Sequence, residues 1–159
     1  MIIMGVDPAL NHTGFAVLDE KLNLLESGVI NSIGRNLEEK LVEIYDGLRD
    51  VIEKWHPNYF VMEDAFYHRN PRTAIKLGAV KGVCLLAAKH SNLKIINIPP
   101  TVIKLSITGS GHANKEQVAF MVKKILKLDF NMSSHESDAI ACVLAAIHKL
   151  RKDAIFNKR

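Results

Sequence analysis

Three carboxylates and one histidine occupy positions from which they could act together. Asp7 comes late in a short apolar run near the start, Glu63 ends the run NYFVME, and Asp138 lies in the first turns of an apolar, helix-like segment. His135 precedes Asp138 by three positions, so the two share one face if that segment is helical. If the three acids converge, their mutual repulsion is unfavourable unless a cation binds among them.

The chemistry that such a cluster predicts is metal-dependent hydrolysis. Carboxylate oxygens suit Mg²⁺ or Mn²⁺. Two such ions about 4 Å apart can activate a water and stabilise the leaving oxygen of a phosphodiester. His135 could be a ligand, which would favour tolerance of Mn²⁺, or it could carry protons, and the sequence leaves both roles open.

Each acid also has a purely structural interpretation. Asp7 precedes a proline and would suit a turn, Glu63 could be a solvated strand end, and Asp138 could interact with a helix dipole. Ser133 and Glu136 fit the pattern S-x-x-E, which predicts a capping box with Ser133 as the N-cap. Glu136 is therefore expected to be structural, and no single acid settles the function.

The elements that must position these residues alternate between strands and helices. Residues 2–7, 14–19 and 24–30 are predicted to form three sequential strands of an antiparallel meander. Crossover helices after the meander predict an α/β fold with a mixed central sheet and helices on both faces. The predicted order continues as helix, strand, helix, strand, helix and helix over residues 36–55, 58–63, 73–90, 93–100, 116–128 and 133–150.

Composition and charge set wide limits. The 159 residues suit one domain over 1–150, followed by a basic C-terminal tail over 151–159 that we expect to be frayed. A net charge of +4 and a pI near 9.1 permit an anionic partner without requiring one. Cys84 and Cys142 are expected to be buried thiols in a reducing compartment. No targeting segment and no apolar run of about 18 residues is present, which predicts a cytoplasmic protein that does not bind membranes.

Four motifs taken together carry a specific resemblance. They read GVDPALNHTG, MEDAFYHRNPRTAIKLGAVKG, TVIKLSITGSGHANKEQV and HESDAIACVLAA. In content, order and spacing they resemble the motifs of the RuvC family, the bacterial Holliday-junction resolvases of the RNase H-like superfamily, over nearly the whole chain. The chain departs from many relatives at Ala9, where glycine is frequent, and at His135, where aspartate is frequent.

The resemblance implies an RNase H-like fold and a homodimeric, Mg²⁺-dependent endodeoxyribonuclease. Such an enzyme would resolve four-way DNA junctions by paired symmetric nicks in recombination and repair. It also implies association with the RuvA–RuvB branch-migration complex. Carried over by motif, the catalytic and metal-binding residues would be Asp7, Glu63, His135 and Asp138, with two Mg²⁺ ions per site and Mn²⁺ tolerated.

Aromatic and basic residues beside the acids are candidates for DNA contacts. Phe66 and Tyr67 could stack on unpaired bases for about 1–3 kcal/mol, or one could pack into the core. Lys104 and Lys115 flank the TGSG loop, whose backbone N–H groups could meet a phosphate. The resemblance places Phe66 at the junction centre and both lysines near the scissile strand. The full candidate set is Phe66, Tyr67, Arg72, Lys76, Lys104 and Lys115.

Gly78 and Gly82 lie four apart on one face of the predicted helix over 73–90, so another element can approach closely there. That element could be the protein's own sheet. The resemblance instead implies that this helix lies near a dimer seam. A two-fold axis would suit paired cuts on a symmetric substrate.

Other functions fit parts of the sequence. A different RNase H-like enzyme, cutting an RNA–DNA hybrid or a flap, would share the acids but not the last two motifs. A sugar-kinase-like or actin-like ATPase also begins with an Asp-bearing hairpin and a Thr-Gly, but needs two such domains around its nucleotide. A catalytically inactive junction-binding module predicts missing acids, whereas the set here is complete.

Overall fold

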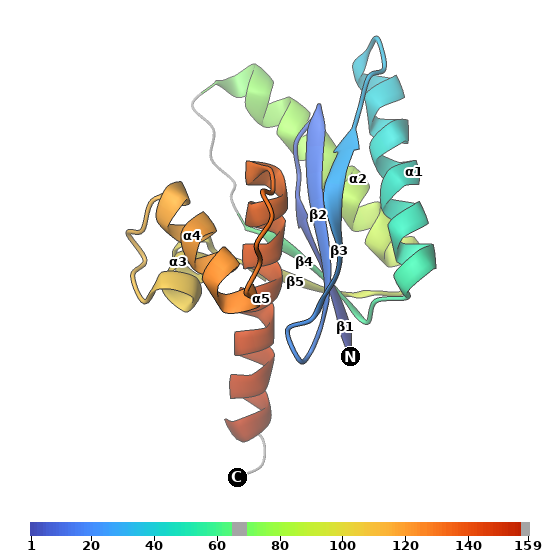
Figure 1. Cartoon of the computed structure of the whole chain (residues 1–159). Coiled ribbons are helices and arrows are strands. Elements are labelled where there is room, and N and C mark those ends of the chain that lie inside the picture. Colours follow the sequence, from blue (N-terminus) through green and yellow to red (C-terminus); the bar gives the residue numbers. More distant parts are fainter. Residues whose placement is uncertain (65–69, 157–159) are drawn as a thin grey trace.

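The computed structural model describes residues 1–64 and 70–156. A twisted sheet is flanked by helices, and the last long helix runs beside it from end to end (Figure 1). The elements, in chain order, are β1 Ile2–Asp7, β2 His12–Asp19, β3 Leu24–Asn31, α1 Leu37–Trp55, β4 Tyr59–Glu63, α2 Pro71–His90, β5 Lys94–Ile98, α3 Pro100–Thr108, α4 Lys115–Leu126 and α5 Ser134–Phe156.

The five strands form one mixed sheet in the order β3-β2-β1-β4-β5. β1 pairs antiparallel with β2, and β2 with β3, so the predicted meander is confirmed. β4 then pairs parallel with β1, and β5 parallel with β4. The carboxyl ends of β1 and β4 therefore lie side by side at one end of the sheet. Asp7 and Glu63 are the last residues of these two strands.

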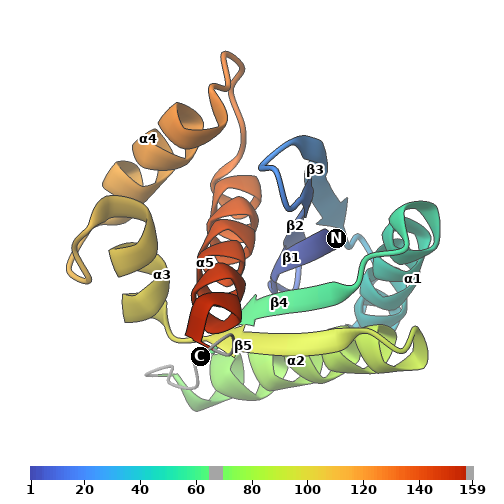
Figure 2. The same cartoon turned by 90° about the horizontal axis from the view of Figure 1, so that it is seen from below.

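Helices cover both faces of the sheet, as the fold class predicts. α1 and α2 pack on the face that carries Met4, Val6 and Phe60. α5 packs on the opposite face, against Ile3, Ala16 and Val61, with α3 and α4 outside it (Figure 2). Adjacent residues of a strand thus enter different cores, as the two-residue period of a strand requires.

The predicted order of elements is wrong at one place, because it omits α3. The sequence predicts that the prolines at 99 and 100 only end a strand. Pro100 instead occupies the first turn of α3, where a missing N–H costs nothing and the fixed φ suits a helix. Ile103 and Ile107 are buried one turn apart, and Gly109, with φ of 77°, ends the helix in the left-handed region.

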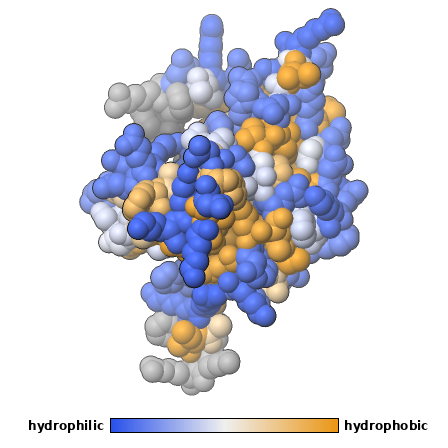
Figure 3. Space-filling model, viewed as in Figure 1, coloured by the Kyte–Doolittle hydropathy of each residue, from blue (hydrophilic) through white to orange (hydrophobic). Residues whose placement is uncertain are grey.

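The last helix is longer than predicted. α5 continues through residues 151–156, so most of the basic tail is helical rather than frayed. Its segment from Ala139 to Ile147 is buried throughout, whereas Ile155 is exposed beyond the sheet. Apolar surface gathers over the middle of this face of the molecule (Figure 3). In the described part of the chain, no helix combines the length and apolarity that crossing a bilayer requires.

The two cysteines are buried and unpaired, as predicted. Cys84 lies in the core under α1 and α2, and Cys142 lies in the core under α5. Burial raises the pKa of the Cys84 thiol to about 12, so it stays protonated at neutral pH. Both residues act as small apolar side chains.

Candidate active site

Asp7 and Glu63 point toward the same face of the sheet. Val6 pairs with Met62 across the parallel β1–β4 ladder, and both side chains enter the core beneath α1 and α2. The next residue on each strand faces the other way, toward α5. Two neighbouring strand ends therefore direct their carboxylates into one space.

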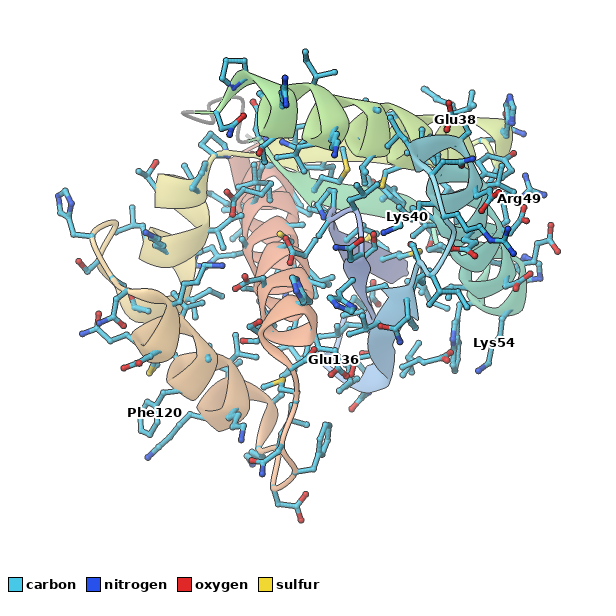
Figure 4. All side chains as sticks on the ribbon, turned by 90° about the horizontal axis from the view of Figure 1, so that it is seen from above. Glu38, Lys40, Arg49, Lys54, Phe120 and Glu136 are labelled. Carbon is cyan, nitrogen blue, oxygen red and sulfur yellow. The ribbon has the colours of Figure 1, made fainter. Side chains whose placement is uncertain are left out.

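The first turn of α5 is fixed above these acids by its cap. The Ser133 hydroxyl accepts the Glu136 N–H at 3.2 Å, and the Glu136 carboxylate accepts the Ser133 N–H at 2.9 Å. The other oxygen of Glu136 accepts the Ser27 hydroxyl at 3.0 Å, which ties α5 to β3 (Figure 4). Burial opposes ionisation of Glu136, but these hydrogen bonds lower its pKa below the ordinary value. The predicted capping box is confirmed.

Two glycines let α5 approach the strands closely. A Cβ on Gly5 would overlap the carbonyl oxygen of Ala139, and a Cβ on Gly14 would overlap the carbonyl oxygen of His135. Gly14 pairs with Asp7 across the β1–β2 ladder. The backbone of α5 at His135 is thus in contact with the strand beside Asp7, which sets the height of the helix above the acids.

His135 bonds directly to the first acid. Its Nδ1 lies 2.8 Å from Oδ2 of Asp7, and both side chains are about one-third exposed. An ionised carboxylate only accepts hydrogen bonds, so Nδ1–H is the donor when Asp7 carries its charge. This contact orients the imidazole and leaves its Nε2 as the atom that can take up a proton or a ligand.

Asp138, one turn further along α5, bonds to a lysine from another helix. The ammonium of Lys115, the first residue of α4, lies 2.9 Å from Oδ2 of Asp138, and this bond raises the pKa of Lys115. Lys104 of α3 lines the same cavity. The cavity, of about 230 Å³, is lined by Asp7, Glu63, Pro100, Ile103, Lys104, Lys115, Val118, Asp138 and Ala141.

The acids repel one another within this cavity. Burial is the main cause that raises the pKa of Asp7, and the charge of Asp138 adds to it, against the hydrogen bond from His135. Burial also raises the pKa of Glu63, with further contributions from Asp7 and Asp138. A cation in the cavity would relieve this repulsion.

The carboxylates that line the cavity are of the kind that binds metal ions, but two of them are hydrogen-bonded to protein side chains. Among the described residues, no three His, Cys, Asp or Glu side chains are close enough to form a ready-made metal cluster. Asp7 bonds to His135 and Asp138 to Lys115. Three carboxylates that line one cavity suit Mg²⁺ or Mn²⁺, and an incoming cation would exchange for the ammonium of Lys115.

The other predicted residues fall into two groups. Arg72 and Lys76 are exposed on the first turns of α2, outside the acid-lined cavity. Phe66 and Tyr67, with the rest of residues 65–69, lie outside the described residues, so their predicted roles stay predictions.

Sequence reasoning missed polar neighbours of the site. The ammonium of Lys81 on α2 donates to the carbonyl oxygen of Glu63 at 3.3 Å. The ring of His12, at the start of β2, lies 6.1 Å from the ring of His135. His12 belongs to the first motif, GVDPALNHTG, so its proximity to Asp7 in sequence was an available signal.

Comparison with known proteins agrees with this geometry. The sequence profile of the family described as "Crossover junction endodeoxyribonuclease RuvC" matches residues 3–148. A protein of that name from Tolumonas auensis is 37% identical over 150 residues, which cover 92% of this chain and 87% of the relative. One from Anaplasma phagocytophilum is 40% identical over 154 residues, covering 92% and 94%.

Solved structures give the same result. The structure described as "T. thermophilus RuvC in complex with Holliday junction substrate" superposes with a TM-score of 0.88 at 30% identity and covers 96% of both chains. The yeast mitochondrial Holliday junction resolvase Ydc2, with a TM-score of 0.64 and 12% identity, shares the fold. The profile, the relatives and the superposition together show that this chain belongs to the RuvC family of crossover junction endodeoxyribonucleases.

Proposed function

We propose that this chain resolves four-way DNA junctions by hydrolysing phosphodiester bonds in the cavity between β1, β4, α3, α4 and α5. The nuclease activity, in recombination and repair, follows from its family. The assignment of that activity to this cavity rests on one observation: three carboxylates from two strand ends and α5 line it together with two lysines.

The carboxylates are the proposed metal ligands. Asp7, Glu63 and Asp138 would hold Mg²⁺, in two ions per site, with Mn²⁺ as a substitute. Such ions, when bound, activate a water and stabilise the leaving oxygen of a phosphodiester. Asp7 is oriented by the Nδ1–H of His135, and the Nε2 of His135 can hold a proton or complete the ligand set.

The lysines are the proposed contacts to the cleaved strand. Lys115 bonds to Asp138, and once a cation takes that carboxylate the lysine ammonium can turn to a phosphate. Lys104 lines the same wall of the cavity. Arg72 and Lys76, exposed on α2, would neutralise phosphates further from the cut. Stacking by Phe66 and Tyr67 remains part of the proposal from sequence.

A homodimer is proposed through α2. Ile75, Gly78, Gly82 and Leu86 lie on one face of this helix at spacings of three and four. Ile75 is 72% exposed and Leu86 48%, and a Cβ on either glycine would touch none of the described residues within 4 Å. The packing of these glycines on their own sheet is therefore excluded, and a second copy is the proposed occupant, since a symmetric substrate requires two related sites. Association with RuvA–RuvB and a cytoplasmic location remain predictions.

Junction cleavage tests the assignment directly. Wild-type protein is incubated with a mobile four-way junction and Mg²⁺, and we expect paired nicks that EDTA abolishes. Asp7→Asn should lower the single-turnover rate by at least about 100-fold, because it removes a charged ligand where the reaction needs one. Asp50→Asn, on an exposed face of α1, is the matched control and should cleave as wild type does. Equal rates for wild type and Asp7→Asn would refute the assignment.

A further inference from the structure

A row of polar side chains continues the site toward α1. It consists of Asn11, His12, Asn31 and Lys40. Asn11 and His12 lie at the start of β2, and Asn31 is the last residue of β3. Both positions are at the same end of the sheet as Asp7. Lys40 lies in the first turns of α1. None of the four lines the acid-lined cavity.

The row is made of two hydrogen-bonded pairs, and one of them lies near His135. The ammonium of Lys40 donates to Oδ1 of Asn11. Nδ1 of His12 bonds to Oδ1 of Asn31 at 2.9 Å, and the His12 ring lies 6.1 Å from that of His135, which bonds Asp7. The Lys40–Asn11 pair and the His12–Asn31 pair are neighbours through the sequence positions of Asn11 and His12, and together they extend from the carboxyl end of β1 toward α1.

Lys40 faces the end of the sheet that carries Asp7. In the view onto this end of the molecule, Lys40 lies between α1 and the strand ends, whereas Lys54, near the other end of α1, pairs with Glu26 of β3 (Figure 4). α3 and α4, which carry Lys104 and Lys115, lie beyond α5 on the opposite side of the same view. Cations are thus placed on both sides of the acids.

The charge of Lys40 is not used for an ion pair within the described chain. Its helical neighbour Glu39 accepts the N–H of Arg35 at 2.7 Å, and Glu43 accepts the N–H of Gly34 at 3.0 Å. Both carboxylates thus hold the loop before α1. Asn11 accepts from Lys40 through its amide oxygen, so its NH₂ group is the part that can donate to another acceptor. An ammonium and an amide NH₂ side by side on an accessible surface suit a phosphate.

We propose that Lys40 and Asn11 bind one backbone phosphate of the cleaved DNA strand. This phosphate flanks the scissile phosphate, on the side away from Lys104 and Lys115. This subsite rests on the proposed function, because it assumes that the strand crosses the cavity. Its effect is to hold the strand at two points, so that the scissile phosphate is placed between them over the acids.

Salt dependence of binding tests the subsite. Junction affinity is measured in EDTA over a range of salt concentrations for wild type, Lys40→Gln and the control Lys54→Gln. Each phosphate neutralised adds about 0.9 to the slope of log affinity against log salt, so Lys40→Gln should reduce the slope by about 1 and weaken binding several-fold. Lys54→Gln should leave the slope unchanged. An unchanged slope in Lys40→Gln would overturn the proposal.

Neutral phosphates locate the contact. Single methylphosphonates are placed in turn on either side of the scissile phosphate. At one flanking position the substitution should weaken wild-type binding but leave binding by Lys40→Gln unaffected. If every methylphosphonate affects both proteins equally, the subsite does not exist. If wild type binds no junction at all, the proposed function fails instead, so the two failures are distinguishable.

Discussion

Gly5 and Gly14 lie under α5, whereas Gly78 and Gly82 lie on an open face of α2. A Cβ on either of the first two would overlap a backbone carbonyl of α5, and a Cβ on either of the second two would meet no atom within 4 Å in residues 1–64 and 70–156. The first pair brings a helix of the same chain to the acids. The second pair leaves a helix face available to a second chain. The same residue type therefore permits a close contact within the molecule in one place and leaves an open helix face, the proposed dimer surface, in the other.

The largest expected effect comes from closing the contact under α5. Gly14→Ala places a methyl group against the carbonyl of His135, so α5 must shift and His135 must move from Asp7. We expect a loss of about 3 kcal/mol in the free energy of unfolding. We also expect a loss of at least about 100-fold in cleavage rate, since displacements near 1 Å have that effect. Urea unfolding and single-turnover cleavage measure the two losses.

The control for this substitution is Gly111→Ala. A Cβ there would lie 3.4 Å from the carbonyl oxygen of Thr101, which is ordinary contact. Its free energy of unfolding should stay close to that of wild type, and the comparison is limited to stability because Gly111 belongs to the TGSG loop, a candidate phosphate contact. If Gly14→Ala behaves as Gly111→Ala does, α5 is not held by close contact with β2, and the contrast between the two glycine pairs disappears.

The next effect concerns the open face of α2. Ile75→Glu places a charge beside Gly78 and should give a folded monomer, because burying an unpaired carboxylate in a dimer interface is unfavourable. Light scattering should show the wild-type mass halved, with the melting temperature of the monomer little changed. Leu105→Glu on α3, also at an exposed apolar position, should leave the mass unchanged. Equal masses for wild type and Ile75→Glu would remove α2 from the interface.

A smaller effect is expected from the crowded acids. Burial raises the pKa of Glu63, so the folded state binds its proton more tightly than the unfolded chain does. The contribution of Glu63 to the stability of the metal-free protein should therefore fall as the pH rises from about 4.3 through the raised pKa of Glu63. Glu63→Gln should lack this contribution and should be more stable than wild type at pH 7, which chemical unfolding at several pH values can measure.

Metal addition should reverse that order. Mg²⁺ at 100 times its dissociation constant would add about 2.7 kcal/mol to the stability of wild type. Glu63→Gln, which lacks one proposed ligand, should gain less at the same concentration. Equal gains in both proteins would mean that Glu63 is not a ligand. A stability difference between wild type and Glu63→Gln that is the same at pH 4 and pH 7 would contradict the raised pKa of Glu63.

The smallest effect is expected at the bond between β3 and the cap of α5. Ser27→Ala removes the hydroxyl that donates to Glu136 and should cost about 1 kcal/mol, with a modest fall in cleavage rate. Ser106→Ala is the control, because its hydroxyl bonds only to the carbonyl of Val102 in its own helix. A change in Ser27→Ala no larger than in Ser106→Ala would show that the capping box alone holds the first turn of α5.

Local patterns predicted the parts of the site that depend on local structure. The ends of two strands gave Asp7 and Glu63, and a spacing of three on a helix gave His135 and Asp138. The pair between Lys115 and Asp138 was not predictable, because it joins side chains 23 positions apart on different helices. Only the packing of α4 against α5 brings them together.

Two further misses have physical causes of the same kind. α3 is missing from the predicted order because Pro99 and Pro100 also suit the end of a strand. A proline in the first turn is equally compatible with the start of a helix. The open face at Gly78 and Gly82 was ambiguous, since small residues at helical spacing fit packing within or between chains equally well. The position of Lys40 beside Asn11 depends on how α1 lies across the sheet, which no local pattern encodes.

The bond between Asp7 and His135 joins residues 128 positions apart in the chain. Asp138 is likewise carried by α5, whereas Asp7 and Glu63 end strands that come much earlier in the chain. Bringing such distant residues together costs loop-closure entropy. The Asp7–His135 bond and the complete set of three acids therefore exist only when α5 lies on the sheet, so the cavity depends on the tertiary fold and not on any local segment.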